Sequence, residues 1–173
     1  WGFCFPMKKK KGYVLVRIWI EFTKDAPLRY LSHLDLMRMW QRALRRAALP
    51  LVYSQGFNPH PKMSFASALP VGVTSQAEYL DLQFAKDITD EDVSKLQSVL
   101  PDGADILQWR PVYQAVPALM SLVRAAYWTA GLTESPSVIL ARINKLLSSE
   151  EIPVKRVTKK GERTVDVLPF IYQ

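Results

Sequence analysis

The sequence predicts an α+β fold, with a ferredoxin-like β-α-β-β-α-β first half followed by a partial second ferredoxin-like half. Three observations support this. Residues 13–23 alternate apolar and polar side chains, which indicates a half-buried strand. Segments with helical apolar spacing follow N-cap residues and alternate with short strand-like runs. The length of 173 residues and an apolar content of 49% suffice for a packed core.

The first half is expected to span residues 13–115. Its first strand, 13–23, ends at Lys24-Asp25-Ala26-Pro27. A helix begins after Ser32, a good N-cap with Asp35 at the capping-box position, and ends before Pro50. We assign the apolar stripe of this helix to Leu34, Met37, Gln41, Leu44 and Ala48, with Trp40 and Ala47 beside it.

Four further strands and one helix complete the first half. The strands are predicted over 51–55, 63–69, 77–85 and 104–112. The helix begins after Thr89, with Asp92 as its capping-box partner. The carboxylates are scattered and predicted to lie at the surface, without a catalytic pair: Asp25, Asp35, Glu78 and Asp81.

Residues 116–173 repeat this order of elements in part. A strand is predicted over 125–132, a helix after Ser135-Pro136, and a hairpin of strands 152–158 and 163–171. The halves share no sequence identity, so the repeat lies in element order alone. At the other end, residues 1–12 are expected to form a basic, flexible segment containing Lys8–Lys11, and translation is expected to start at Met7.

Charge and cysteine content narrow the classes of function. A net charge of +7 and a pI near 9.6 favour polyanionic partners, with nucleic acid first. The single cysteine, Cys4, excludes an intramolecular disulfide and a self-contained Cys-ligated cluster, and it fits a reducing cytoplasm. No apolar run approaches the roughly 20 residues that cross a bilayer. We therefore expect a cytoplasmic protein without membrane contact.

Four arginines share one face of the first helix: Arg38, Arg42, Arg45 and Arg46. Guanidinium groups bind phosphate bidentately and stay charged at physiological pH, so this face is a candidate for contact with a nucleic-acid backbone. An acidic protein partner would suit the same face. A solvated helix face, with Asp35 and Arg38 as a local pair, is the plainer alternative.

The following loop, Gln55 to Lys62, combines amide, imidazole, ammonium and aromatic groups. Its two prolines hold the preceding residues extended without a hydrogen-bond ladder. Such groups suit binding of a base or ribose phosphate, and we assign that role to Gln55, Phe57, Asn58, His60 and Lys62. The alternative is a structural turn with Phe57 buried.

No catalytic residue is assigned. His33 and His60 could together cleave RNA by acid–base catalysis, but a structural role for His33 at the helix start is favoured. Nothing in the sequence indicates a metal or cofactor site. Further phosphate attraction, or merely solubility, is expected from a second basic cluster: Lys155, Arg156, Lys159, Lys160 and Arg163.

Several uncommon strings resemble the radical SAM-associated domain of unknown function 2344. They are Arg29-Tyr30-Leu31-Ser32-His33-Leu34-Asp35, Arg42 to Ala47, Gln55 to Lys62, Ala77 to Asp81, Pro117 to Leu122 and Thr158 to Pro169. The resemblance implies a neighbouring or fused radical SAM protein, often with a B12-binding region, and an RNA-related gene neighbourhood. It implies no catalytic residues in this chain.

Together these observations predict a non-catalytic RNA-binding accessory domain that presents transfer or ribosomal RNA to a radical SAM partner. An iron–sulfur cluster, S-adenosylmethionine and B12 would belong to that partner, and this chain would hold no cofactor. Two alternatives remain open. One is a protein-docking module for the radical SAM partner, and the other is an RNA endonuclease of tandem ferredoxin-like type that uses His33 or His60.

Overall fold

The computed structural model describes residues 15–113, 115–158 and 161–171. The chain divides into two compact units, 1–126 and 127–173. We predicted the change between halves after residue 115. The later boundary arises because the short helix α3, Leu119–Leu122, contacts strands β2 and β3 of the first unit. The predicted basic segment 1–12 lies outside the described residues.

The first unit is an α+β structure, as predicted. Its main elements are β1 (Val16–Lys24), α1 (His33–Arg46), β2 (Met63–Phe65), β3 (Ser75–Phe84), α2 (Asp90–Val99) and β4 (Ile106–Val112). The strands form one sheet in the order β2-β3-β1-β4, with every neighbouring pair antiparallel. The β-α-β-β-α-β element order is observed. The ferredoxin-like assignment stays a prediction, which this strand order supports.

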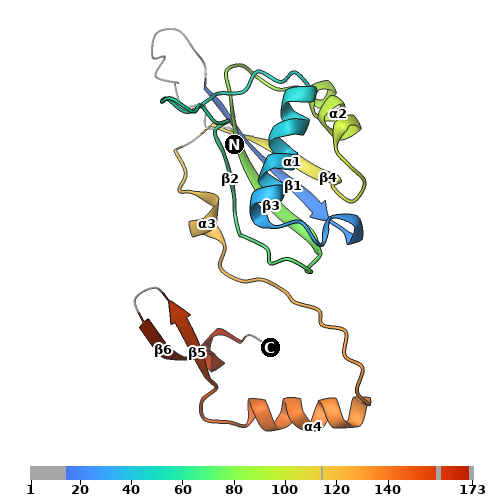
Figure 1. The fold of residues 1–173 in the computed structure, drawn as a ribbon, viewed down its shortest axis with the longest axis vertical. Coiled ribbons are helices and arrows are strands. Elements are labelled where there is room, and N and C mark those ends of the chain that lie inside the picture. The colour runs from blue at the N-terminus through green and yellow to red at the C-terminus, as the bar shows by residue number, and fades with distance from the viewer. Residues whose placement is uncertain (1–14, 114, 159–160, 172–173) are drawn as a thin grey trace, which may run out of the picture. The chain divides into compact units, whose positions relative to one another are not determined.

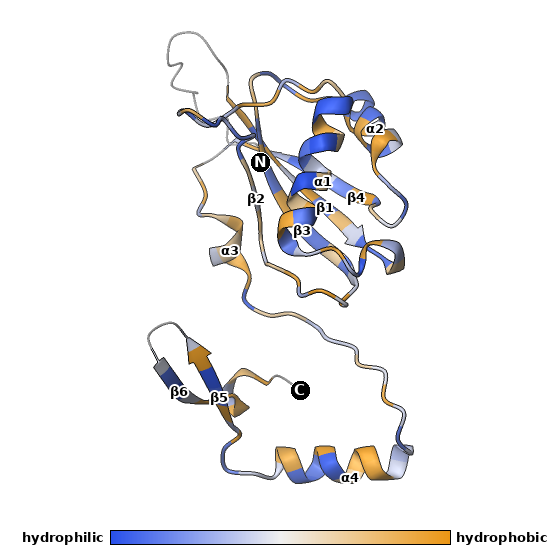
Figure 2. Cartoon of the chain, viewed as in Figure 1, coloured by the Kyte–Doolittle hydropathy of each residue, from blue (hydrophilic) through white to orange (hydrophobic). Residues whose placement is uncertain are grey.

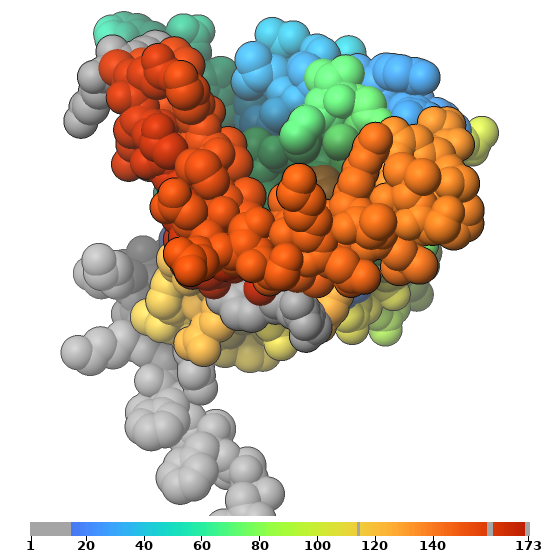
Figure 3. Space-filling view, turned by 90° about the horizontal axis from the view of Figure 1, so that it is seen from below, coloured from blue at the N-terminus to red at the C-terminus, as the bar shows by residue number. Residues whose placement is uncertain are grey.

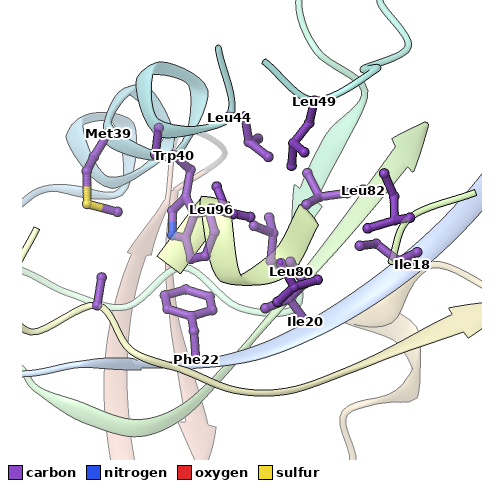
Figure 4. Packing of buried hydrophobic residues seen from close by; sticks show 14 of the residues in the cluster. Ile18, Ile20, Phe22, Met39, Trp40, Leu44, Leu49, Leu80, Leu82 and Leu96 are labelled. Atoms are coloured by element: carbon purple, nitrogen blue, oxygen red, sulfur yellow. The ribbon is translucent and has the colours of Figure 1, made fainter. Parts of the chain in front are cut away.

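One face of the sheet carries the core, and α1 and α2 cover it (Figure 1). The period-two pattern of β1 buries Val16, Ile18, Ile20 and Phe22, as predicted. The β1–β3 register sets these residues beside apolar side chains of β3, Leu80, Leu82 and Phe84. The ring of Trp40 packs edge-on against Phe22, 4.8 Å between centroids, at the centre of this cluster (Figure 4).

The predicted apolar stripe of α1 was only partly right, because Leu44 and the neighbouring Trp40 are buried as predicted but other members of the stripe are not. The helix buries Leu36, Met39, Trp40, Ala43 and Leu44, whereas Leu34 is 54% exposed and Gln41 half-buried. The first turns of this helix carry apolar residues on more than one side, so helical spacing alone is compatible with two different apolar stripes. Packing decided between them, because the large indole of Trp40 fills the space above Phe22.

Both predicted helix starts are confirmed by their caps. The hydroxyl of Ser32 accepts a hydrogen bond from the backbone N–H of Asp35, at 3.2 Å. Thr89 and Asp92 form a full capping box at the start of α2. These bonds satisfy backbone N–H groups that the first helical turn leaves unpaired.

The short strands differ from prediction. Residues 51–55 form only single bridges, Leu51 to Phe84 and Tyr53 to Pro61, so the predicted strand there was wrong. The strand predicted over 63–69 ends at Phe65. Proline lacks a backbone N–H, and Pro50, Pro59 and Pro61 prevent a continuous ladder through this region.

Two carboxylates predicted at the surface are buried: Glu78 is 6% exposed and Asp81 is 5% exposed. Glu78 lies opposite Phe22 on the helix-covered face and accepts a hydrogen bond from the Ser67 hydroxyl, at 3.2 Å. Asp81 accepts bonds from the Arg17 guanidinium on the other face, at 2.8 and 2.9 Å from Nε. A partner on the neighbouring segment makes each burial tolerable.

Lys24, at the end of β1, is also fully buried. Its ammonium donates to the carbonyl oxygen of Leu31, at 3.2 Å. Burial lowers the pKa of Lys24, and the nearby Glu78 carboxylate opposes that shift. The alternation of buried residues in β1 thus continues to Lys24, beyond the last apolar position. There the buried side chain is stabilised by a nearby opposite charge and not by apolar packing.

The second unit contains α4 (Pro136–Leu147), β5 (Pro153–Thr158) and β6 (Gly161–Asp166). The predicted helix is confirmed, with Pro136 in its first turn. The predicted hairpin forms, but its second strand spans 161–166 instead of 163–171, and a 3-10 helix follows at Leu168–Phe170. The strand predicted over 125–132 is absent, because no neighbouring strand offers it hydrogen bonds within the described residues. Only α-β-β of the expected second half is therefore observed.

Most residues of α4 are apolar, yet none is buried. In Figure 2 this helix carries hydrophobic segments interrupted by hydrophilic ones, and Figure 3 shows the orange part of the chain, which includes this helix, at the surface. Among the described residues, no helix has the length and apolar character needed to cross a membrane.

Candidate nucleic-acid interface

Helix α1 presents the four predicted arginines to solvent. Of these, Arg38 is engaged locally, because its Nη1 lies 3.1 Å from Oδ1 of Asp35. A hydrogen bond from the Ser32 hydroxyl, followed by the Arg38 contact, lowers the pKa of Asp35. For Arg38, the structure therefore fits the plainer alternative, a local ion pair on a solvated helix face.

Arg42, Arg45 and Arg46 differ from Arg38 in having no counterion. Within the described part of the chain, no carboxylate lies within ion-pair distance of these three guanidinium groups. Arg45 and Arg46 fall in the last turn of α1, where cations also stabilise the helix dipole. Their unpaired charge leaves all three available to an anionic ligand.

A shallow groove of about 350 Å³ runs between α1 and the C-terminal end of α2. Arg42 and Arg46 stand on its α1 side, one helical turn apart. The remaining lining is apolar and comes from both helices: Met39, Ala43, Val99, Leu100 and Pro101. The groove thus offers an apolar floor beside two guanidinium groups.

The loop after α1 is closed by backbone hydrogen bonds at its base. The N–H of Ser54 donates to the carbonyl oxygen of His60, at 2.8 Å, and the N–H of His60 donates to the Ser54 hydroxyl, at 3.0 Å. One step further down, the N–H of Lys62 donates to Val52, at 2.7 Å. The loop is therefore anchored without using its side chains, apart from the Ser54 hydroxyl.

The predicted contact residues all lie at the exposed part of this loop: Gln55, Phe57, Asn58, His60 and Lys62. The Phe57 side chain is 106% exposed, which contradicts the alternative of a turn built around a buried Phe57. Gly56 adopts φ +131°, a conformation that side-chain-bearing residues rarely adopt. The loop thus holds the ring of Phe57 in solvent.

The arginines and the loop belong to one stretch of chain without acidic residues. Residues 36–77 contain no Asp or Glu, but four Arg and one Lys. In Figure 1 the segment 51–62 leaves the C-terminal end of α1 and lies at that end of the unit. The bridge from Leu51 to Phe84, at the end of β3, holds it there. The absence of acidic residues over this stretch is visible in the sequence alone and could have indicated this surface.

The two histidines are separate. The His33 ring packs edge-on against Phe65, 5.3 Å between centroids, and its buried Nδ1 has no partner among the described residues. His60 is exposed and precedes Phe65 by five residues of extended chain, or about 16 Å. The endonuclease alternative, which requires the imidazoles to meet, finds no support in this geometry.

The remaining predicted basic cluster is only partly described, because residues 159 and 160 lie outside the described ranges. Lys155 pairs with Glu162 across the β5–β6 hairpin, at 3.4 Å, and Arg156 and Arg163 are exposed. In the residues that the structure describes, no group of three or more His, Cys, Asp or Glu side chains is arranged to hold a metal ion.

Sequence reasoning missed the opposite face of the sheet. There the Arg17–Asp81 pair and the stack of Arg110 on Trp19, 4.7 Å to the ring centroid, bring together residues far apart in the chain. The alternation in β1 placed Arg17 and Trp19 on this face. Their cross-strand partners depend on strand order and register, which no local pattern encodes.

The fold and surface define an α+β protein with an exposed basic helix followed by a solvent-facing aromatic loop. Residues 17–173 match the family described as an uncharacterized protein conserved in bacteria, DUF2344. The chain belongs to this family. No curated protein matches the chain.

Proposed function

We propose that this protein is a non-catalytic, cytoplasmic accessory domain that binds RNA through α1 and the loop of residues 55–62. In this proposal it presents transfer or ribosomal RNA to a radical SAM partner, which carries the iron–sulfur cluster, S-adenosylmethionine and B12. The radical SAM partner is inferred from the family resemblance, whereas RNA binding is inferred from the exposed residues of α1 and the loop.

One observation carries the proposal: three unpaired guanidinium groups and a fully exposed phenylalanine lie within a stretch that has no acidic residue. Unpaired guanidinium groups attract phosphates, and an exposed ring stacks on unpaired bases. An acidic protein partner would account for the arginines. It gives no role to the ring of Phe57 beside the amides of Gln55 and Asn58.

The test compares two charge-matched triple variants. In Arg42→Ala/Arg45→Ala/Arg46→Ala the proposed phosphate contacts are removed. In Lys86→Ala/Lys95→Ala/Arg142→Ala, three exposed cations that belong neither to α1 nor to the loop of residues 55–62 are removed instead. Affinity for transfer RNA is measured by fluorescence anisotropy over a range of salt concentrations.

The first variant should bind more weakly, with a salt slope reduced by about 2–3, since each lost phosphate contact removes roughly 0.7–0.9 of slope. The second should retain the wild-type slope. Equal losses of affinity in both variants would show that net charge alone causes the effect. Unchanged binding in the first variant would refute the role of α1. Retention of a protein partner after nuclease treatment, without RNA affinity, would favour the docking module.

A further inference from the structure

The sheet face turned away from α1 and α2 presents aromatic rings and cations. The odd-numbered residues Arg17, Trp19 and Glu21 of β1 point to this side and are half-buried, while the even-numbered ones form the core. In the register of the sheet, Trp19 lies opposite Arg110 and Glu21 lies opposite Tyr79. These side chains come from the central strands β1 and β3 and from the edge strand β4.

Trp19 and Arg110 form a stacked pair on this face. The guanidinium carbon of Arg110 lies 4.7 Å from the centroid of the Trp19 ring, and that of Arg17 lies 5.8 Å away. Arg110 is exposed, and Trp19, over which its guanidinium lies, is half-buried. Nucleic-acid bases stack on guanidinium planes as well as on aromatic rings.

Tyr79 extends this surface toward the next strand. Its side chain is 40% exposed. Burial and the nearby Glu21 carboxylate raise the pKa of Tyr79, and Arg110 lies near enough to oppose that shift. The phenol is therefore neutral at physiological pH, and it adjoins both Glu21 and Arg110.

The acidic groups of this face are already engaged. Arg17 binds both oxygens of Asp81, and the side-chain amide of Gln108 donates to Glu21. Arg17 also donates to the carbonyl oxygen of Val116, at 3.0 Å, so the chain after β4 borders the face on one side. The positive charge of Arg110 has no ion-pair partner in the described ranges.

We propose that Trp19, Tyr79 and Arg110 form a stacking platform for unpaired bases of single-stranded RNA. The proposal rests on the RNA-binding function proposed above and adds a second contact surface on the same unit. Duplex RNA buries its base planes, so the platform selects single-stranded segments, whereas the arginines of α1 contact phosphates in either form.

The test measures binding of a fluorescein-labelled oligouridine and of a blunt RNA duplex by anisotropy. Tyr79→Ala and Arg110→Ala should each weaken oligouridine binding about tenfold and leave duplex binding within twofold of wild type. Tyr79→Phe, which keeps the ring, should bind as wild type does. Tyr30→Ala is the matched control, because Tyr30 is exposed and lies under Arg29, at 5.2 Å, as part of a different pair.

Photocrosslinking supplies a second measurement on the unaltered protein. Oligouridine containing 4-thiouridine should form adducts on peptides from β1, β3 or β4. Adducts confined to residues 55–62, with Tyr79→Ala and Arg110→Ala both binding normally, would overturn the platform while leaving the proposed function intact. Absence of any RNA binding by the wild-type protein would overturn both proposals.

Discussion

Replacing Phe57 with alanine should separate RNA binding from folding. Because the Phe57 side chain is 106% exposed, its removal takes no apolar surface out of the folded interior. The free energy of unfolding should therefore change by no more than about 0.5 kcal/mol, the range for surface substitutions. By contrast, Trp40 is fully buried, and Trp40→Ala should cost about 3–5 kcal/mol.

The binding effect of the same change should be large. A base stacked on an aromatic ring contributes about 1–3 kcal/mol, so Phe57→Ala should weaken RNA binding roughly 5- to 150-fold. Phe57→Tyr keeps the ring and should preserve affinity. Loop closure should persist in both variants, because the Ser54–His60 hydrogen bonds do not involve the Phe57 side chain.

Two assays read out the two effects. Urea denaturation followed by circular dichroism gives the free energy of unfolding, and anisotropy with single-stranded RNA gives affinity. A loss of stability above about 1 kcal/mol in Phe57→Ala would show that the ring is buried in solution. Unchanged affinity at wild-type stability would remove the loop from the interface.

Three further predictions concern stability. Burial lowers the pKa of Lys24 in the folded state, so between that pKa and its ordinary value of 10.5 the unfolded chain holds more protons. The free energy of unfolding of the wild type should therefore rise with pH in that window relative to that of Lys24→Met. Urea denaturation of both proteins at pH 7.5 to 10 measures this difference, and a difference that does not change with pH would contradict the prediction. Asp81→Ala leaves Arg17 without its carboxylate and should lower the free energy of unfolding, measured by urea denaturation, by about 3 kcal/mol. The double variant Arg17→Met/Asp81→Leu should lower it less. A larger loss in the double variant than in Asp81→Ala would refute the pairing argument. Gly103 adopts φ +90°, and an added Cβ would lie 3.1 Å from Cδ of Pro27, so Gly103→Ala should lower the free energy of unfolding by about 1–2 kcal/mol; an unchanged thermal midpoint would argue against that turn.

Predictions from the sequence succeeded where a signal was local. The Ser32 and Thr89 caps, the alternation of β1 and the β5–β6 hairpin each depend on residues within a few positions of one another. Backbone hydrogen bonding and side-chain periodicity act at that range, so their patterns are visible in one sequence.

Predictions failed where distant contacts made the choice. The apolar stripe of α1 was assigned only partly correctly because Trp40 selects its face by packing on Phe22, which lies on another element. The strand predicted over 125–132 lacks a neighbour, and a strand exists only through hydrogen bonds to another strand. Glu78 and Asp81 were wrongly predicted at the surface. Their burial depends on the compensating charges of Lys24 and Arg17, which lie far away in the chain and are not visible in a local pattern.

The sequence by itself determined the basic character of the protein, the arginines on one helix and the composition of the loop of residues 55–62. Only the tertiary structure decided that this loop exposes its phenylalanine, and that Trp19, Tyr79 and Arg110 meet on one face of the sheet. The physical reason is that exposure and cross-strand contact depend on strand order and register, which arise when the whole unit packs around one core.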